Sequence, residues 1–207
     1  MRKVVVVALA LVWSVLSLVR ISAAAPPLIK VFVLKPNPKF GPCAQRFSTV
    51  PLGSEATVAE GPLNDTLTLR LANFKPGLAF DLFTIQNSNL NSDGSLNTNV
   101  KNFGLAWYQT DVQIDPNGSA FVEIETILIN QIFGFDPAVS LAPTNTFHVG
   151  IWFNNPADAT ACGFTGTTPF NGEHNAGPNA MITVPSATTG LGPLCLNPST
   201  TPGKCNP

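Results

Sequence analysis

The alternation of apolar and polar side chains along the chain is typical of β-strands, because successive side chains in a strand point to opposite faces of the sheet. The clearest case is residues 66–71, where the leucines share one face and Thr66, Thr68 and Arg70 share the other. Further strands are predicted at residues 78–86, 105–114, 119–129, 146–153 and 180–184, and an apolar, valine-rich run predicts another at residues 28–34. No segment shows a helical period of 3.6 residues.

Pro76-Gly77 predicts a tight turn after the strand at residues 66–71. Proline suits the first centre position of a type II turn, and glycine accepts the positive φ of the second. The next strand begins at once, at residue 78. Residues 66–86 are therefore expected to form a β-hairpin.

The segment Asp115-Pro116-Asn117-Gly118 predicts a second hairpin, between residues 105–114 and 119–129. Matching the faces of the two strands favours a three-residue loop with a bulge at Gly118. In that register the expected pairs are Asp115–Ser119, Ile114–Ala120, Val112–Val122 and Thr110–Ile124.

Strands at this spacing, separated by turn residues, predict an all-β fold: an antiparallel β-sandwich of Ig-like or jelly-roll-like type. Residues 154–178 and 186–207 are dense in Pro, Gly, Asn and Thr, and they are expected to form long loops. The sandwich domain is accordingly assigned to residues 25–185. Residues 186–207 are assigned to a loop-rich C-terminal tail held by a disulfide.

Residues 1–24 have the features of a secretory signal peptide. Arg2 and Lys3 precede an apolar run from Val4 to Val19, and small residues precede a cleavage site after Ala24. The apolar run is shorter than the roughly 20 residues that cross a bilayer. We expect a secreted, extracellular protein without a membrane span after cleavage; the alternative is an uncleaved N-terminal anchor.

Low charge excludes several classes of protein. Charged residues make up 11% of the chain, against roughly 25% in a typical soluble domain. Loss of residues 1–24 removes Arg2, Lys3 and Arg20, which leaves 8 basic and 12 acidic residues and a net charge of −4. A disordered chain is more charged and less apolar, and a nucleic-acid-binding protein has a basic excess.

Four cysteines in an exported chain predict two disulfides. Cys195 and Cys205 are close in sequence and separated by flexible residues, so we favour their pairing. Cys43 then pairs with Cys162. A zinc site is the alternative, but no Cys-x-x-Cys pair is present.

Residues 71–83, the turn at 115–118 and the strand segment at 146–152 resemble exported bacterial β-sandwich domains of fibronectin-like and CHRD-like style. The resemblance implies a style of fold and supplies no catalytic residues. The CHRD-like pattern would have His-x-His where this chain has Phe80-Asp81-Leu82. The resemblance therefore implies no metal site.

Asn89, Asn91 and Asp93 lie at alternate positions before Gly94, as in a calcium-binding loop. The position of the usual bidentate glutamate is occupied by Val100, and only one of the ligands is charged. The alternative is a solvated Asn/Ser/Gly loop, and we assign no metal or cofactor to the chain.

Asp111, Glu123 and Glu125 are expected to share one face of the second hairpin, with Asp111 opposite Glu123. Two glutamates two residues apart on a strand can serve as the acid and the nucleophile of a retaining glycosidase. The alternative is the solvent-facing side of an amphipathic hairpin. Only the spacing of the two glutamates favours catalysis.

Trp107, Tyr108 and Trp152, with His148 nearby on the same strand as Trp152, are candidates for a sugar-stacking surface. The alternative is that loops bury this side of the sheet. No nucleophile motif of the Gly-x-Ser-x-Gly type is present.

These observations favour a non-catalytic, secreted extracellular protein with a structural, adhesive or assembly role. Its expected partners are other copies of itself, other surface proteins or glycans, and not nucleic acid. A carbohydrate-binding module using the outward aromatics is the second hypothesis, and a β-sandwich glycosidase using Glu123 and Glu125 is the third.

Overall fold

Strands make up most of the regular structure in this computed structural model, which describes residues 29–100, 103–126, 146–166 and 177–195. The described strands are β1 (Ile29–Phe32), β2 (Lys35–Pro36), β3 (Gly53–Ala59), β4 (Asp65–Ala72), β5 (Ala79–Ile85), β6 (Ala106–Gln113), β7 (Ala120–Thr126), β8 (Thr146–Phe153), β9 (Asn179–Ile182) and β10 (Leu194–Cys195). Helical structure in the same residues is limited to the 3₁₀ helix η1 (Gly41–Ala44) and to α1 (Pro156–Ala161).

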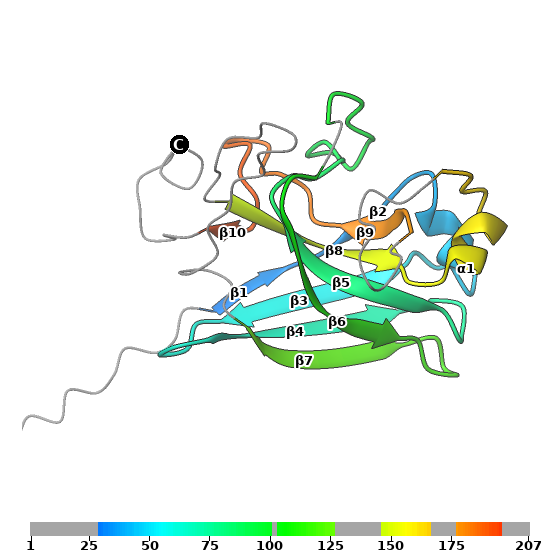
Figure 1. Ribbon diagram of the computed structural model, residues 1–207, viewed down its shortest axis with the longest axis horizontal. Helices are drawn as coiled ribbons and strands as arrows, with labels where there is room; N and C mark the ends of the chain where they lie inside the picture. The colour runs from blue at the N-terminus through cyan, green and yellow to red at the C-terminus, as the bar shows by residue number, and fades with distance from the viewer. Residues whose placement is uncertain (1–28, 101–102, 127–145, 167–176, 196–207) are drawn as a thin grey trace, which may run out of the picture.

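The strands form two antiparallel sheets (Figure 1). One sheet has the order β1-β3-β4-β7. The other has the order β2-β9-β8-β5-β6, with β10 paired to β8. The prediction of a strand-rich antiparallel fold is confirmed.

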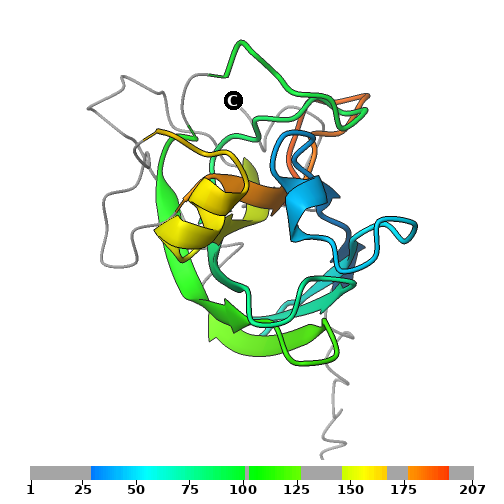
Figure 2. The same cartoon turned by 90° about the vertical axis from the view of Figure 1, so that its right-hand side faces the viewer.

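One face of each sheet contributes to a common hydrophobic core. The first sheet supplies buried side chains from alternate positions of β3 and β4, among them Val58, Leu67 and Leu69. The second sheet supplies Phe80 and Leu82 from β5, together with alternate residues of β8. Figure 2 shows the two sheets on opposite sides of this interior. The period-2 pattern of the sequence therefore identified the inward faces of β4 and β8.

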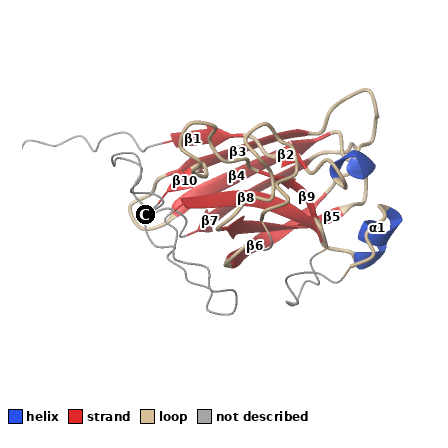
Figure 3. Cartoon of the chain, turned by 90° about the horizontal axis from the view of Figure 1, so that it is seen from above, coloured by secondary structure: helices blue, strands red, loops and turns tan. Residues whose placement is uncertain are grey.

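The two predicted hairpins are wrong. β4 pairs with β3 and β7, whereas β5 pairs with β8 and β6, so neither turn joins two neighbouring strands of one sheet. Each turn instead carries the chain from one sheet to the other. Figure 3 shows the strands of the two sheets overlapping when the chain is seen from above. Matched apolar faces are equally compatible with strands that pair edge to edge and with strands that face each other across a core.

The local turn chemistry was nevertheless predicted correctly. Gly77 has φ +84°, and the Leu78 N–H donates to the Lys75 carbonyl at 3.4 Å. The Asp115 N–H donates to the Ser119 carbonyl at 2.8 Å, and Gly118 has φ +85°. The register beyond that turn differs from the prediction, because the residues of β7 pair with β4: Val122 lies opposite Leu69 and Ile124 opposite Leu67.

The sequence pattern did not predict β3 or α1. β3 pairs with β4 through the hairpin that the chain does form, but its inward residues are the small Ala56 and Val58, which give weak alternation. α1 lies within residues 154–178, which were predicted to be loop. Asn155 caps this helix by accepting the N–H of Ala157 at 2.9 Å, and Pro156 occupies its first turn.

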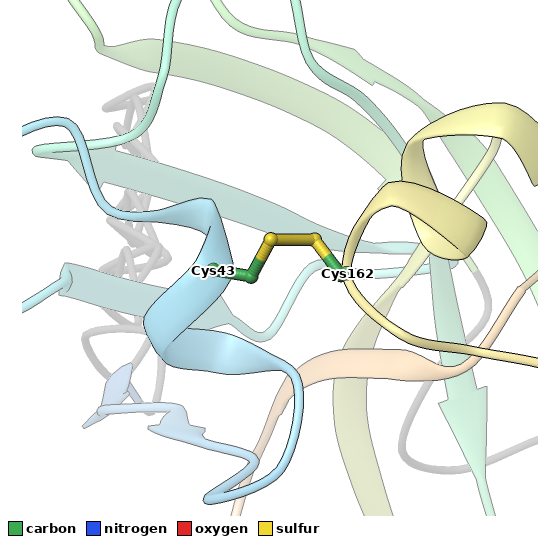
Figure 4. The surroundings of a disulfide bond; sticks show 2 residues. All are labelled: Cys43 and Cys162. Atoms are coloured by element: carbon green, nitrogen blue, oxygen red, sulfur yellow. A yellow bond between two sulfur atoms is a disulfide. The ribbon is translucent and has the colours of Figure 1, made fainter.

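The predicted disulfide between Cys43 and Cys162 is confirmed (Figure 4). It joins η1 to the residue that follows α1, with the two Cα atoms 5.6 Å apart. Closing a loop of this length stabilises a fold by about 4–5 kcal/mol in the chain-entropy model. The predicted Cys195–Cys205 pairing lies outside the described residues, because Cys205 does.

Candidate functional site

The outer face of the four-stranded sheet carries an exposed apolar strip along β1. Ile29, Val31 and Val33 are 58%, 63% and 49% exposed. Ile29 and Val31 alternate with half-buried residues of β1, and Val33 continues the alternation just beyond the strand. We call these three residues the β1 patch. Among the described residues, β3 is the only strand that pairs with β1, so the patch lies at the edge of the sheet.

The rest of this outer face is mainly polar, with Phe121 as an exposed aromatic residue. Thr57 on β3 lies between Val31 on β1 and Thr68 on β4, and the same row ends at Glu123 on β7. Closer to the turns, the Arg70 guanidinium lies 4.4 Å from the centre of the Phe121 ring. The sheet face therefore changes from apolar at the β1 edge to acidic at the β7 edge.

The expected acidic face is not formed. Asp111 belongs to β6 and lies opposite Asp81, whereas Glu123 belongs to β7 and lies opposite Thr68 in the other sheet. The prediction failed because the two strands do not pair. Glu123 and Glu125 do share the outer face of β7, where both are exposed. The spacing of Glu123 and Glu125 is the only observation that still favours the glycosidase hypothesis.

Sequence reasoning missed the arrangement around Asp81. This carboxylate is fully buried on β5, and its Oδ1 accepts the side-chain amide of Asn154 at 2.6 Å. On the neighbouring strand, the Tyr108 hydroxyl donates to Asp111 Oδ1 at 2.9 Å. Burial, together with the nearby carboxylates of Asp111 and Asp81, raises the pKa of Tyr108 to about 12. The signal in the sequence that could have revealed this arrangement was a single carboxylate, Asp81, within a mainly apolar strand.

Trp152 lies in the interior and offers no exposed ring face. It is fully buried, and the rings of Phe83 and Phe103 meet it edge to face at 5.5 and 5.2 Å. The indole also covers Gly150, where a Cβ atom would lie 2.6 Å from Trp152 Cζ3. This small cluster forms a second core between the sheet and the segment that follows β5. The alternative that loops bury this side of the sheet therefore describes Trp152 correctly.

Trp107 and His148 do not join Trp152 in a common surface. Trp107 packs edge to face on Phe147 in the core between the sheets, at 5.3 Å. His148 is buried, and its Nδ1 lies 2.9 Å from the hydroxyl oxygen of Thr183. Burial lowers the pKa of His148 to about 4, so the imidazole is neutral at physiological pH. Tyr108, at 39% exposed, is the most accessible ring of the predicted platform.

The predicted calcium-loop residues are held by hydrogen bonds within the protein. Asn89 exchanges two side-chain hydrogen bonds with Asn179, at 3.0 and 3.1 Å. The Asn91 amide donates to the Ser95 hydroxyl at 3.0 Å, and Asp93 Oδ1 accepts from that hydroxyl at 2.6 Å. The hydrogen bonds that Asp93 accepts from the hydroxyl and the backbone N–H of Ser95 lower the pKa of Asp93. Among the described residues, no three His, Cys, Asp or Glu side chains gather in a way that could hold a metal ion.

A cavity of about 240 Å³ adjoins this loop. Part of its wall is a buried amide network in which Asn37 donates to Asn179 Oδ1 at 2.7 Å. The remaining wall is mainly aromatic and aliphatic. The lining residues are Asn37, Lys39, Phe40, Asn89, Leu96, Phe103, Trp152, Phe164, Pro178 and Asn179.

No family model, curated protein or solved structure matches the chain. Within the described residues, no helix has the length and apolar character needed to cross a membrane.

Proposed function

We propose that this chain is a secreted, non-catalytic extracellular protein that binds other protein surfaces through the β1 patch, in a structural, adhesive or assembly role. Its scaffold, in this proposal, is a two-sheet β-sandwich. The observation that carries the proposal is the exposure of Ile29, Val31 and Val33 along one edge strand.

An exposed apolar edge strand is unusual, since natural sheets protect their edges with charged side chains, prolines or covering loops. The side chains of the β1 patch are all uncharged and aliphatic. A strand added beside β1 would gain backbone hydrogen bonds and would bury these side chains at the same time. Burial of apolar area gives roughly 25 cal/mol per Å², so even a short added strand would be stabilised.

Export is supported by two independent features. The first 24 residues have the charge and hydropathy pattern of a signal peptide. The disulfide between Cys43 and Cys162 suits an oxidising, extracellular compartment. We propose accordingly that the protein acts outside the cell, after cleavage behind Ala24.

The proposal is tested by the retention of the secreted mature chain, residues 25–207, on the washed surface or matrix fraction of the cells that produce it. Val31→Lys should abolish retention, because it places a charge in the apolar patch. The matched control is Phe121→Lys, which adds the same charge at a similarly exposed residue on the opposite edge of the sheet. Equal retention of both variants, or no retention of the unmodified chain, would overturn the proposal.

Carbohydrate binding is the second candidate, and the cavity beside Asn89 is the observation that favours it. Its wall combines aromatic rings, including Phe103, with side-chain amides, which are the groups that contact the faces and hydroxyls of sugars. A glycan-array screen of the mature chain tests it. Saturable binding that is lost in Phe103→Ala would favour this candidate, and a blank array from folded protein would dismiss it.

A further inference from the structure

We infer that the β1 patch pairs with the β1 patch of a second copy of this chain, so that two four-stranded sheets join into one continuous sheet across a twofold axis. This inference rests on the proposed function, in which the patch binds protein, and it names the partner. The backbone direction of β1, its register and its charges support this pairing.

The contact between Leu34 and Ser54 fixes the direction of the β1 backbone groups. The Leu34 N–H donates to the Ser54 hydroxyl at 2.8 Å, and that hydroxyl donates to the Leu34 carbonyl at 2.9 Å. Both backbone groups of Leu34 therefore face β3. In an antiparallel pair, the backbone groups of successive residues face opposite sides. The N–H and C=O groups of Val33, Val31 and Ile29 accordingly face the open edge.

The outward backbone groups and the exposed side chains thus belong to the same three residues. When two β1 strands meet antiparallel about a twofold axis at Val31, Val31 lies opposite its own copy. Ile29 then lies opposite Val33 of the second copy. Every hydrogen-bonded pair in this register is a pair of β-branched aliphatic residues on one face, which is a favourable cross-strand combination.

Charge selects this register over its neighbours. A shift of the pairing by two residues toward the N-terminus would set Lys30 directly opposite Lys30 of the second copy, and like charges at that position are destabilising. The opposite shift would centre the pairing on Phe32 and would set Ile29 opposite the charged Lys35, so the aliphatic pair made by Ile29 would be lost. In the Val31-centred register, Lys30 lies opposite Phe32. The Lys30 amine also points into its own chain, where it donates to the Pro193 carbonyl at 3.5 Å.

For β1, the β1 strand of a second copy is a better partner than the β7 strand of that copy. The outer face of β7 carries Glu123 and Glu125. Pairing β1 with β7 of another copy would place these carboxylates beside the aliphatic patch, where burial of an unpaired charge is costly. β1 therefore pairs with β1, and the product is a closed twofold dimer rather than an open filament.

The dimer is expected to be weak, because few residues take part. Stable interfaces bury about 1,200–2,000 Å², and a pairing limited to two short strands buries less. We expect dissociation in the micromolar to millimolar range. The association should strengthen with protein concentration and should depend little on salt, because no ion pair spans the interface.

Sedimentation equilibrium of the mature chain, residues 25–207 with disulfides intact, tests the inference. The unmodified chain should show a monomer–dimer equilibrium. Val31→Lys should weaken dimerisation at least tenfold, and Phe121→Lys should leave it unchanged. Val31 is 63% exposed, so its replacement leaves the core intact. A strict monomer at about 1 mM, or equal weakening by both variants, would overturn the inference.

A cysteine variant tests the register. Hydrogen-bonded antiparallel pairs have Cα atoms about 5.5 Å apart, which is within disulfide range. Val31→Cys should therefore give a covalent dimer on mild oxidation. Thr57→Cys, one strand further from the axis on the same face, should not. Failure of Val31→Cys to cross-link, or equal cross-linking by Thr57→Cys, would exclude the Val31-centred pairing.

The two proposals fail separately. Retention on the matrix fraction that depends on Val31, by a chain that sediments as a monomer, would leave the proposed function standing and refute the dimer. Val31-dependent dimers without any retention would support the dimer and refute the binding of other surface proteins.

Discussion

The backbone N–H of Phe74 donates to the carbonyl oxygen of Gly118 over 3.0 Å, and this bond joins the two turns that carry the chain between the sheets. Phe74 follows β4, and Gly118 precedes β7. The Arg46 guanidinium donates to the Asn117 carbonyl beside them, and the Phe74 ring is fully buried. The two crossings therefore form one hydrogen-bonded corner over the end of the core.

Gly118→Ala should destabilise the fold through this corner. Gly118 has φ +85°, which disfavours any residue with a Cβ, and a Cβ there would lie 2.5 Å from the Phe74 carbonyl oxygen. We expect a loss of about 1–3 kcal/mol in the free energy of unfolding from the backbone strain, and a further loss from the clash. Urea unfolding followed by circular dichroism measures it.

Gly94→Ala is the matched control for that substitution. Gly94 has nearly the same φ, +87°, but an added Cβ meets nothing within 4 Å. It should therefore show the strain without the clash. If the two alanine variants lose equal stability, the predicted clash between a Cβ at position 118 and the Phe74 carbonyl is wrong.

The same corner explains what the sequence could and could not predict. The turns at Gly77 and Gly118 and the alternation of β4 depend on neighbours in the sequence, and these were predicted correctly. The sheet to which a strand belongs depends on distant pairing: β7 reaches β4, and β5 reaches β8. A turn signal specifies that the chain reverses, and it does not specify whether the returning strand pairs or crosses the core.

The prediction of the candidate site was limited in the same way, because it also depended on which distant strands pair. Asp111 and Glu123 were placed together only because their strands were assumed to pair. The exposure of Trp152 depended on whether the segment after β5 covers it. The sequence around Trp152 does not show whether a distant segment buries the indole. The β1 patch, by contrast, consists of residues within a strand whose apolar character was visible in the sequence. Its exposure became visible only once β1 was placed at the edge of its sheet.

Trp152→Ala should destabilise the protein, because it removes a fully buried indole that contacts Phe83, Phe103 and Gly150. Truncation of a buried tryptophan costs about 3–5 kcal/mol. Thermal and urea unfolding of the variant measure the loss. Trp107→Ala is the comparison, and it should cost less because Trp107 is only half-buried. Unchanged stability of Trp152→Ala would show that the indole is a surface group after all.

Acidification should weaken the fold through His148. Burial lowers the pKa of the folded His148 to about 4, against 6.5 for an ordinary histidine. Between these values the unfolded chain binds a proton that the folded chain excludes, so the free energy of unfolding decreases as the pH falls. The stabilisation is complete above pH 6.5, and about 2 kcal/mol of it should be lost by pH 5.

The comparison of the unmodified chain with His148→Gln isolates this effect. Carboxylates that titrate in the same range contribute to both proteins, so the difference between their urea unfolding energies at pH 7.5 and pH 5 reports His148 alone. The hydroxyl oxygen of Thr183 lies 2.9 Å from His148 Nδ1 and accepts the Val149 N–H at 3.1 Å. Parallel pH profiles for the two proteins would show that His148 titrates normally and is not enclosed by the fold.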